Sequence, residues 1–365
     1  MRWRKEYNTR LPGRKAMAKG TTYSNEKKAE AMRKFKELRA LLPHYTHFYL
    51  DSMVADYQPN TIVAYARDLI TFFKYLKEAV PMLKEVETRD IPLDIIESLT
   101  SMDILEYKNY LLHNDGENKH SNQASSVERR MAPLRGLCGV LFDTGAVSSN
   151  PTAYSASRRR RRADKREVVY LENEEVQSLL EAVETSKVAS ERQQKFASRT
   201  QLRDSAIITL LLNTGMRVSE LVGIDLGDLN FDDGSVRIIR KGGAEQLVYF
   251  GDHVAAALHD YIELERERFA KDDEPALFLS LQKSRMTVRA VEYMVKKFAR
   301  EAVPNKRISP HKMRSTYGTA LYEKTSDIRL VADVLGHEDV TTTARHYASV
   351  KEKNRKAAGQ IRPYE

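Results

Sequence analysis

The sequence predicts a mainly helical protein of two domains, in which the second domain carries a small antiparallel sheet. Three observations favour this fold class. The chain has 365 residues, which is enough for about two domains. Before residue 150, apolar residues recur at intervals of three and four, as on one face of an α-helix. Between residues 235 and 250 the apolar positions alternate instead, which is typical of β-strands.

The composition excludes several classes of protein. Apolar residues make up 41% of the chain and charged residues 30%, as in a globular protein and unlike a disordered or fibrous one. The single cysteine, Cys138, excludes an intrachain disulfide and a cysteine-based metal cluster, and it is consistent with a reducing compartment. The charged start lacks the apolar stretch of a signal peptide, and no run approaches the ~20 apolar residues of a membrane span. We therefore expect a cytoplasmic or nuclear protein with no membrane span.

The first domain, expected at residues 25–153, is helical. Its clearest helix begins at Pro59 and Asn60, with Asn60 expected as the N-terminal cap. The apolar positions that follow are spaced by three and four residues and predict one buried face: Ile62, Tyr65, Leu69, Phe72 and Leu76. Further helices are expected at 103–113 and 126–142.

Two short segments hold the excess of positive charge. The net charge of the chain is +9, and residues 1–20 and 158–166 each contain seven basic residues against one acidic residue. This concentration favours contact with a polyanion such as nucleic acid, although a targeting signal or a solvated linker would also explain either segment alone. We expect a basic arm at 1–24 and a basic linker at 154–167. The DNA-contacting side chains of the linker would be Arg158, Arg159, Arg160, Arg161, Arg162, Lys165 and Arg166.

The second domain is expected at residues 168–350. Helices are predicted at 172–183 and 204–213, the latter with Asp204 as its cap and Gly215 as its C-terminal stop. Strands are predicted at 235–240 and 245–250, joined as a hairpin through a Lys-Gly-Gly-Ala loop. From residue 252 onward the pattern returns to helix.

Four stretches of this domain contain residues suited to binding and cleaving a phosphate ester. Arg217 lies at a helix junction, and Lys241 lies at the tip of the hairpin. Ser309 and Pro310 are suited to the start of a helix, so His311 and Arg314 would share its first turn, where N–H groups and the helix dipole favour an anion. His337 follows a helix that Gly336 would end, and Tyr347 follows ten residues later. Arginine side chains match phosphate oxygens, His and Lys can transfer protons, and a tyrosine hydroxyl can form a covalent ester.

Taken singly, each of these residues also has an ordinary structural explanation. An isolated arginine is usually part of a surface ion pair, and an isolated histidine is usually a hydrogen-bonded polar group. The chain has 18 tyrosines, and Tyr317 and Tyr322 compete with Tyr347 on local grounds. The evidence for a phosphate-cleaving site therefore comes from the order and spacing of these residues along the chain, and not from any one of them.

In that order, the motifs resemble the tyrosine recombinase (lambda-integrase-like) family. They are Thr-Gly-Met-Arg-Val-Ser-Glu-Leu at 214–221, Arg-Lys-Gly-Gly at 240–243, His-Lys-Met-Arg at 311–314, Leu-Gly-His at 335–337, and Tyr347. The match covers residues 204–350, and the helical domain resembles the core-binding domain of the family less specifically. The resemblance implies a helical SAM-like core-binding domain and a mixed α/β catalytic domain that clamp DNA like a C.

The resemblance also implies a role for each matching residue. Arg217 and Arg314 would bind the scissile phosphate, with Glu220 supporting the site from behind. Lys241 would protonate the leaving 5′ oxygen.

The other three matching residues would act around the nucleophile. His311 would assist proton transfer, His337 would hydrogen-bond the phosphate, and Tyr347 would attack it to give a 3′-phosphotyrosine. The covalent link would conserve the bond energy, so no cofactor, metal or ATP is implied. The sequence departs from the family pattern at Ser315, where a second histidine is common, and around Tyr347, but no catalytic group is lost.

Within the family, the chain is most similar to stand-alone Xer-type recombinases that resolve chromosome dimers. Residues 36–43 and 57–73 and the compact length favour this interpretation. The partners implied are a double-stranded DNA recombination site on the nucleoid, a homotetramer on two paired sites, and an accessory protein as a further partner to consider. The tail at 351–365 would either be exchanged between protomers or fray at the end of the chain. An integrase or excisionase of a mobile element is the main alternative. A type IB topoisomerase and a DNA-binding protein without catalysis are the others.

Overall fold

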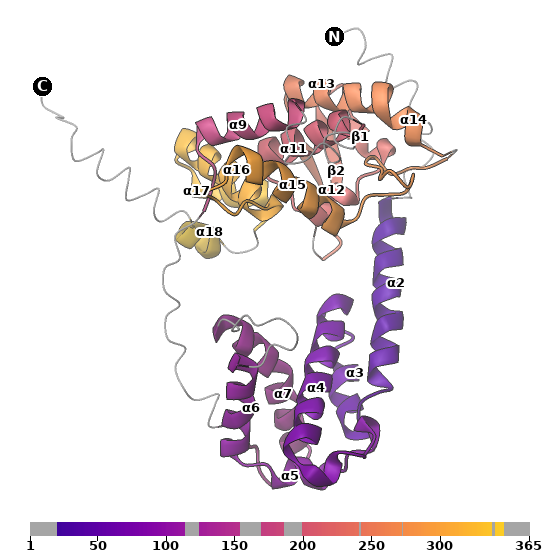
Figure 1. Ribbon diagram of the computed structural model, residues 1–365, viewed down its shortest axis with the longest axis vertical. Helices are drawn as coiled ribbons and strands as arrows, with labels where there is room; N and C mark the ends of the chain where they lie inside the picture. The colour runs from indigo at the N-terminus through magenta and orange to yellow at the C-terminus, as the bar shows by residue number, and fades with distance from the viewer. Residues whose placement is uncertain are drawn as a thin grey trace, which may run out of the picture. The chain divides into compact units, whose positions relative to one another are not determined.

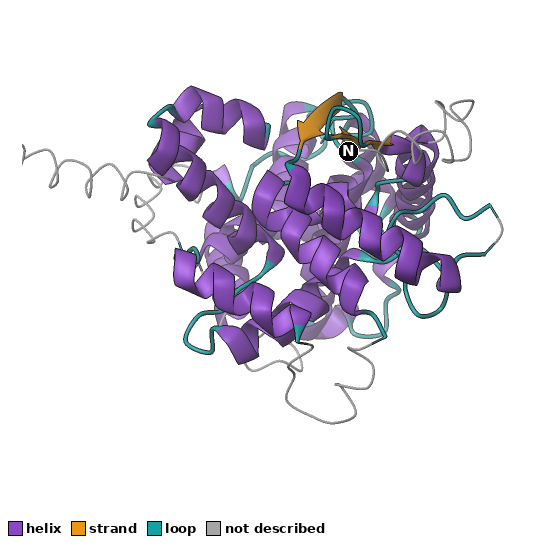
Figure 2. Ribbon diagram, turned by 90° about the horizontal axis from the view of Figure 1, so that it is seen from above, coloured by secondary structure: helices purple, strands orange, loops and turns teal. Residues whose placement is uncertain are grey.

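The computed structural model describes residues 20–113, 124–153, 169–185, 199–240, 242–271, 273–337 and 340–346. The chain divides into two compact units. We call Asn25–Asp164 the helical unit, and Met1–Ser24 together with Lys165–Glu365 the mixed unit. Figure 1 labels the elements of both units, and Figure 2 shows that the strands form a small part of a mainly helical protein. The predicted fold class, mainly helical with a small antiparallel sheet, is confirmed.

The helical unit is built on two long helices that pack against each other, α4 and α7. Leu69 and Phe72 of α4 and Leu137 of α7 are at most 1% exposed and belong to one core cluster, which also buries Cys138. The helices of this part of the chain are α2 (Gly20–Arg39), η2 (His44–Thr46), α3 (His47–Ser52), α4 (Pro59–Ala79), η3 (Pro81–Leu83), η4 (Thr88–Asp90), α5 (Leu93–Ser98), α6 (Ser101–His113) and α7 (Ala124–Asp143).

The periodic face predicted in α4 is confirmed. Ile62, Leu69, Phe72 and Leu76 are buried and Tyr65 is half-buried. The predicted cap was wrong, because Gln58 occupies the cap position and Pro59 begins the helix, which places Asn60 inside the first turn. Proline has a fixed φ that suits a helix and no N–H to leave unpaired, so it favours the first helical position. The helix therefore starts at Pro59, one residue earlier than a cap at Asn60 would allow.

The mixed unit is organised around α11 (Gln201–Thr214), which packs against α9 (Asn173–Glu184), α13 (Asp252–Asp260) and α16 (Pro310–Thr325). Its other helices are α12 (Val218–Val222), η5 (Leu226–Asp228), the π-helix η6 (Tyr261–Arg266), α14 (Glu267–Phe269), α15 (Val288–Ala302), α17 (Ile328–Leu335) and α18 (Val340–His346).

The predicted hairpin is confirmed. Strands β2 (Ser235–Ile239) and β3 (Glu245–Tyr249) pair antiparallel, with Ser235 opposite Tyr249 and Ile239 opposite Glu245. A third, two-residue strand that the alternation did not predict, β1 (Leu229–Asn230), pairs with the other edge of β2. The short loop after Ile239 therefore brings residues 240–244 to one end of the sheet.

The cap predicted for α11 was wrong. The helix begins at Gln201, and Asp204 lies inside its first turn with 1% of its surface exposed. Its carboxylate accepts hydrogen bonds from the Arg203 guanidinium and from the Thr200 hydroxyl, so it pairs with side chains and does not cap. The predicted stop at Gly215 is confirmed, because this residue adopts the left-handed conformation at φ 61° that glycine tolerates.

Candidate active site

Arg217 is held at the junction between α11 and α12 by the carboxylate of Glu220. Glu220 Oε1 accepts a hydrogen bond from Arg217 Nη1 at 2.8 Å, and Oε2 accepts one from the Arg217 backbone N–H at 2.7 Å. The Glu220 side chain is 3% exposed, whereas that of Arg217 is 34% exposed. The carboxylate therefore fixes the guanidinium from the protein side and leaves part of it facing solvent, where an anion could reach it.

Arg314 is the fifth residue of α16 and is buried. The helix begins at Pro310 after Ser309, as the sequence predicts, although Ser309 makes no side-chain cap. Arg314 Nη1 donates to the carbonyl of Gly215 at 2.7 Å, and Nη2 donates to the carbonyl of Leu335. One guanidinium thus joins three segments that are far apart in the sequence.

The C-terminal end of α17 is the point where the arginines meet. The carbonyls of three consecutive residues, Val334, Leu335 and Gly336, each accept a hydrogen bond from a different arginine. Their donors are Arg240 Nη2 at 2.9 Å, Arg314 Nη2, and Arg217 Nη2 at 3.2 Å. The last carbonyls of a helix have no partner within the helix, so guanidinium groups can satisfy them. We call Arg217, Arg240 and Arg314 the arginine cluster.

His337 lies directly after this helix end. Gly336 ends α17 in the left-handed conformation at φ 63°, as predicted, and the His337 N–H then donates to the Ala332 carbonyl at 2.9 Å. The ring Nδ1 is 2.7 Å from the hydroxyl of Thr343, a fully buried residue of α18. The turn and the hydroxyl together fix the ring beside the arginine cluster.

His311 lies one turn before Arg314 on α16. Partial loss of solvent lowers the pKa of its imidazole below the ordinary 6.5, and the positive charges of Lys312, Arg314 and Arg217 lower it further. The neutral form of the ring, which can accept a proton, is therefore favoured near pH 7.

Two members of the predicted site, Lys241 and Tyr347, lie outside the described residues. So do the predicted DNA contacts of the linker: Arg158, Arg159, Arg160, Arg161, Arg162, Lys165 and Arg166. The structure does bring together the described candidates Arg217, Glu220 and Arg314, and it places His337 at the same helix end.

The two competing tyrosines both have packing roles. Tyr322 is buried with Val331 and Leu335 in a small apolar cluster. Tyr317 is half-buried, which raises the pKa of its hydroxyl, and its ring lies against Gly215 so closely that a Cβ there would be 2.6 Å from a ring carbon. A higher pKa makes the phenolate, the stronger nucleophile, harder to form.

Sequence reasoning missed Arg240. The residue is the first of the Arg-Lys-Gly-Gly motif at 240–243, in which the sequence indicated a role for the lysine at the hairpin tip alone. Here the side chain is 8% exposed and shares the carboxylate of Glu220 with Arg217. The signal that could have identified Arg240 is its place in the motif, where two cationic residues stand side by side before two glycines.

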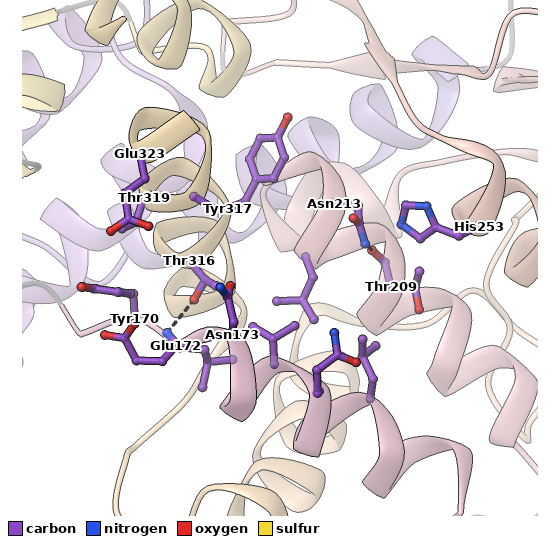
Figure 3. A pocket seen from close by; sticks show the side chains of 16 residues that line it. Tyr170, Glu172, Asn173, Thr209, Asn213, His253, Thr316, Tyr317, Thr319 and Glu323 are labelled. Carbon is purple, nitrogen blue, oxygen red and sulfur yellow. Dashed lines mark hydrogen bonds between the residues drawn. The ribbon is translucent and has the colours of Figure 1, made fainter. Parts of the chain in front are cut away.

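A pocket of about 280 Å³ lies on another part of the mixed unit, between α9, α11 and α16 (Figure 3). The Leu171 backbone N–H donates to the Thr316 hydroxyl at its edge, as the dashed line shows. None of the residues predicted to act on phosphate lines this pocket.

Comparison with known proteins decides the family. The model of the phage integrase family matches residues 169–354. The chain belongs to the phage integrase family. The tyrosine recombinase XerC of Caldanaerobacter subterraneus subsp. tengcongensis is 34% identical over 313 residues, which cover 83% of this chain and 81% of that protein.

Two further relatives extend the likeness over most of the chain. The tyrosine recombinase XerS of Lactococcus lactis subsp. cremoris is 27% identical over 355 residues, covering 90% of this chain and 98% of the relative. The XerH site-specific recombinase, solved with a palindromic difH substrate, superposes with a TM-score of 0.64 at 19% identity and covers 83% of this chain and 80% of that one. This integrase-family chain is a site-specific tyrosine recombinase that acts on DNA, with Xer-type relatives.

The described part of this recombinase lacks two features. No helix there is long and apolar enough to cross a membrane. The same part of the chain contains no group of three or more His, Cys, Asp or Glu side chains placed to hold a metal ion.

Proposed function

We propose that this recombinase cleaves each DNA strand by attack of the Tyr347 oxygen on the scissile phosphorus. The new O–P bond gives a 3′-phosphotyrosine, and the bond between phosphorus and the 5′ oxygen breaks. His311 takes the proton of the tyrosine hydroxyl, and Lys241 gives a proton to the leaving 5′ oxygen. Attack by a 5′ hydroxyl of the partner strand reverses these steps and rejoins the DNA, so no external energy source enters the reaction.

The observation that carries this proposal is the meeting of Arg217 and Arg314 at the end of α17, with His337 in the next position. Two guanidinium groups can neutralise the non-bridging oxygens of a phosphate and the charge that develops on them in the transition state. Both are fixed by protein groups before any substrate binds. Fixed donors need little reorganisation during the reaction, which is the source of most electrostatic catalysis.

The lowered pKa of His311 supports its proposed role as the base. A histidine that is mostly neutral near pH 7 can accept the tyrosine proton, whereas a protonated one cannot. Burial is the main cause of the lowered pKa, and the charges that lower it further include those of the two arginines proposed to bind the phosphate.

For the biological role, we propose Xer-type resolution of chromosome dimers, which would place the protein on the nucleoid. The high coverage of the XerC and XerS relatives supports this role more than it supports integration of a mobile element. Strand exchange between two sites requires four protomers, so the proposed assembly is a homotetramer on two paired DNA sites. Residues 351–365 would pass between neighbouring protomers, residues 154–167 would contact the DNA backbone, and an accessory protein could regulate the assembly.

Covalent capture tests the proposed chemistry. A nicked duplex that loses its 5′ product on cleavage traps the 3′-phosphotyrosine, and the complex survives denaturing electrophoresis. We expect a trapped band with the unchanged protein and none with Tyr347→Phe, because phenylalanine lacks the attacking oxygen. Tyr293→Phe, on an exposed tyrosine of the same unit, is the matched control and should trap DNA normally.

Two results would contradict the proposal. A band that persists in Tyr347→Phe would assign the nucleophile to another residue. A protein that binds DNA but traps none of the substrates would indicate a binding protein without cleavage. The sequence of the trapped DNA then separates a chromosomal site from the end of a mobile element.

A further inference from the structure

Arg240 is a buried arginine whose guanidinium nitrogens all have partners inside the protein. Nη1 donates to Glu220 Oε2 at 3.0 Å, Nε donates to Gln246 Oε1 at 2.6 Å, and Nη2 donates to the Val334 carbonyl at 2.9 Å. These partners come from α12, β3 and α17. Three of its five N–H groups hold protein acceptors on three different elements, so we expect its effect on the reaction to pass through these neighbours.

The neighbour that matters is Glu220. Its two carboxylate oxygens hold two arginines: Oε1 and Oε2 bind the side chain and backbone of Arg217, and Oε2 also binds Arg240. Without Arg240, these bonds would tie the carboxylate to Arg217 alone, and the two side chains could shift together; the bond to Arg240 ties the carboxylate to the hairpin as well. Arg240 therefore sets the orientation of the group that orients Arg217.

Arg240 also fixes the helix end to which Arg217 donates. Its guanidinium lies so close to Gly336 that a Cβ there would be 2.8 Å from Nε. The Val334 carbonyl that it binds is two residues before the Gly336 carbonyl bound by Arg217. Of the two acceptors of the Arg217 side chain, Arg240 thus binds one, the Glu220 carboxylate, and lies against the residue that carries the other, Gly336.

We propose that Arg240 is a positioning residue that aims Arg217 at the scissile phosphate, through Glu220 on one side and the end of α17 on the other. The inference rests on the proposed function, in which Arg217 binds a non-bridging phosphate oxygen. Arg240 has no part of its own in the proposed cleavage reaction.

The test measures single-turnover cleavage by Arg240→Gln and Arg240→Lys on the nicked duplex. Misplacing a catalytic group by about 1 Å can lower a rate by as much as about 100-fold, so we expect cleavage by Arg240→Gln to be about 10- to 100-fold slower with DNA affinity unchanged. Arg240→Lys keeps the positive charge near Glu220 but loses the simultaneous hydrogen bonds to three elements. Its cleavage rate should therefore lie between that of Arg240→Gln and that of the unchanged protein. The matched control is Arg237→Gln, three residues earlier, whose guanidinium pairs with Asp228 and has no contact with Glu220.

A second substrate separates positioning from a general loss of structure. Replacing one non-bridging oxygen of the scissile phosphate by a methyl group removes the negative charge that Arg217 neutralises. The fold decrease in cleavage rate caused by Arg240→Gln, relative to the unchanged protein, should therefore be smaller on this neutral substrate. The fold decrease caused by Arg217→Ala should become smaller in the same way. A deficit of equal size on both substrates would overturn the proposal, and so would wild-type cleavage rates in both Arg240 variants. If Arg240→Gln does not fold, the same comparison with Arg240→Lys decides.

Two further experiments separate a failure of the proposed role of Arg240 from a failure of the proposed cleavage mechanism. If Arg217→Ala cleaves the charged substrate normally, the proposed function fails, whatever Arg240 does. A 5′-thiolate leaving group needs no proton, so it should restore cleavage in Lys241→Ala. If it restores Arg240→Gln to the same extent, Arg240 acts on the lysine that follows it in the chain, and the proposed link to Arg217 is wrong.

Discussion

Arg217 and Arg314 are held by the protein in different ways. Arg314 is buried and donates to two backbone carbonyls, so its position depends on the chain itself. Arg217 is partly exposed and depends mainly on one carboxylate. Side-chain support is easier to perturb by a single substitution than backbone support, so we expect the function of Arg217 to be the more sensitive to changes in its surroundings.

The pKa of His311 gives a prediction for the pH dependence of cleavage. Partial burial, and then the positive charges around the ring, lower this pKa below 6.5, so the neutral ring persists to lower pH than in an ordinary histidine. A reaction that needs the neutral ring should therefore slow only as the pH falls below about 6.5, where the ring takes up a proton. The acid limb of kcat/KM, which reports the free enzyme, measures this directly.

The control for this experiment is a second histidine of the same unit. His311→Gln should remove the acid limb and lower the rate, whereas His253→Gln, on α13, should leave both unchanged. An acid limb that survives in His311→Gln would assign the titration to a different group.

In the mixed unit, α17 ends at a glycine that no other residue can replace without cost. Gly336 adopts φ 63°, and an added Cβ would meet the Arg240 guanidinium at 2.8 to 2.9 Å. An L-residue in this conformation costs roughly 1–2 kcal/mol, and the clash adds to that cost. We expect Gly336→Ala to lower the free energy of unfolding by about 1–3 kcal/mol and to slow cleavage, measured by chemical denaturation and by single-turnover kinetics.

Gly227→Ala provides the comparison for that substitution. A Cβ at Gly227 would meet no atom within 4 Å, so this change should alter the free energy of unfolding by no more than about 0.5 kcal/mol. Equal effects of the two substitutions would show that the contact with Arg240 has no energetic weight.

The elements that the sequence predicted well are those fixed by local patterns. The apolar face of α4, the hairpin of β2 and β3, and the glycine stops of α11 and α17 each follow from residues close together in the chain. The caps were predicted less well, since Asp204 found a better partner in Arg203 than in the helix N-terminus.

Elements that depend on distant partners were not predictable. The π-helix η6 presents Tyr261 and Arg266 to the backbone of residues 274–279, and no local pattern of residues 261–266 indicates those bonds. For the site, the motifs indicated Arg217, His311, Arg314 and His337 as a set. The shared helix end and the place of Arg240 in it required the three-dimensional structure, because their donors and acceptors are separated by 21 to 119 residues.

At the scale of the whole molecule, the charge distribution predicts how DNA affinity depends on salt. The linker run at 158–166 carries seven basic residues against one acidic residue, in a chain of net charge +9. Each phosphate neutralised contributes about −0.9 to the slope of log affinity against log salt. Replacing Arg158–Arg162 by alanine should therefore weaken binding and make the slope less steep, as measured by titration at several salt concentrations.

The five-lysine version of the same segment keeps the charge and is the control. It should retain most of the slope, because counterion release depends on charge and not on guanidinium geometry. A slope that does not change in the alanine version would show that these arginines do not contact the DNA backbone.

The end of α17 also limits where residues can be inserted into or deleted from this protein. Successive residues of an α-helix are turned by about 100°, and here three successive carbonyls face three arginines that come from three different segments. One residue inserted within α17 would turn either these carbonyls away from their arginines or Val331 and Leu335 out of the apolar cluster. Loops on the surface can gain or lose residues freely, but this eight-residue helix cannot, and its length should be as constant among functional variants as the arginines themselves.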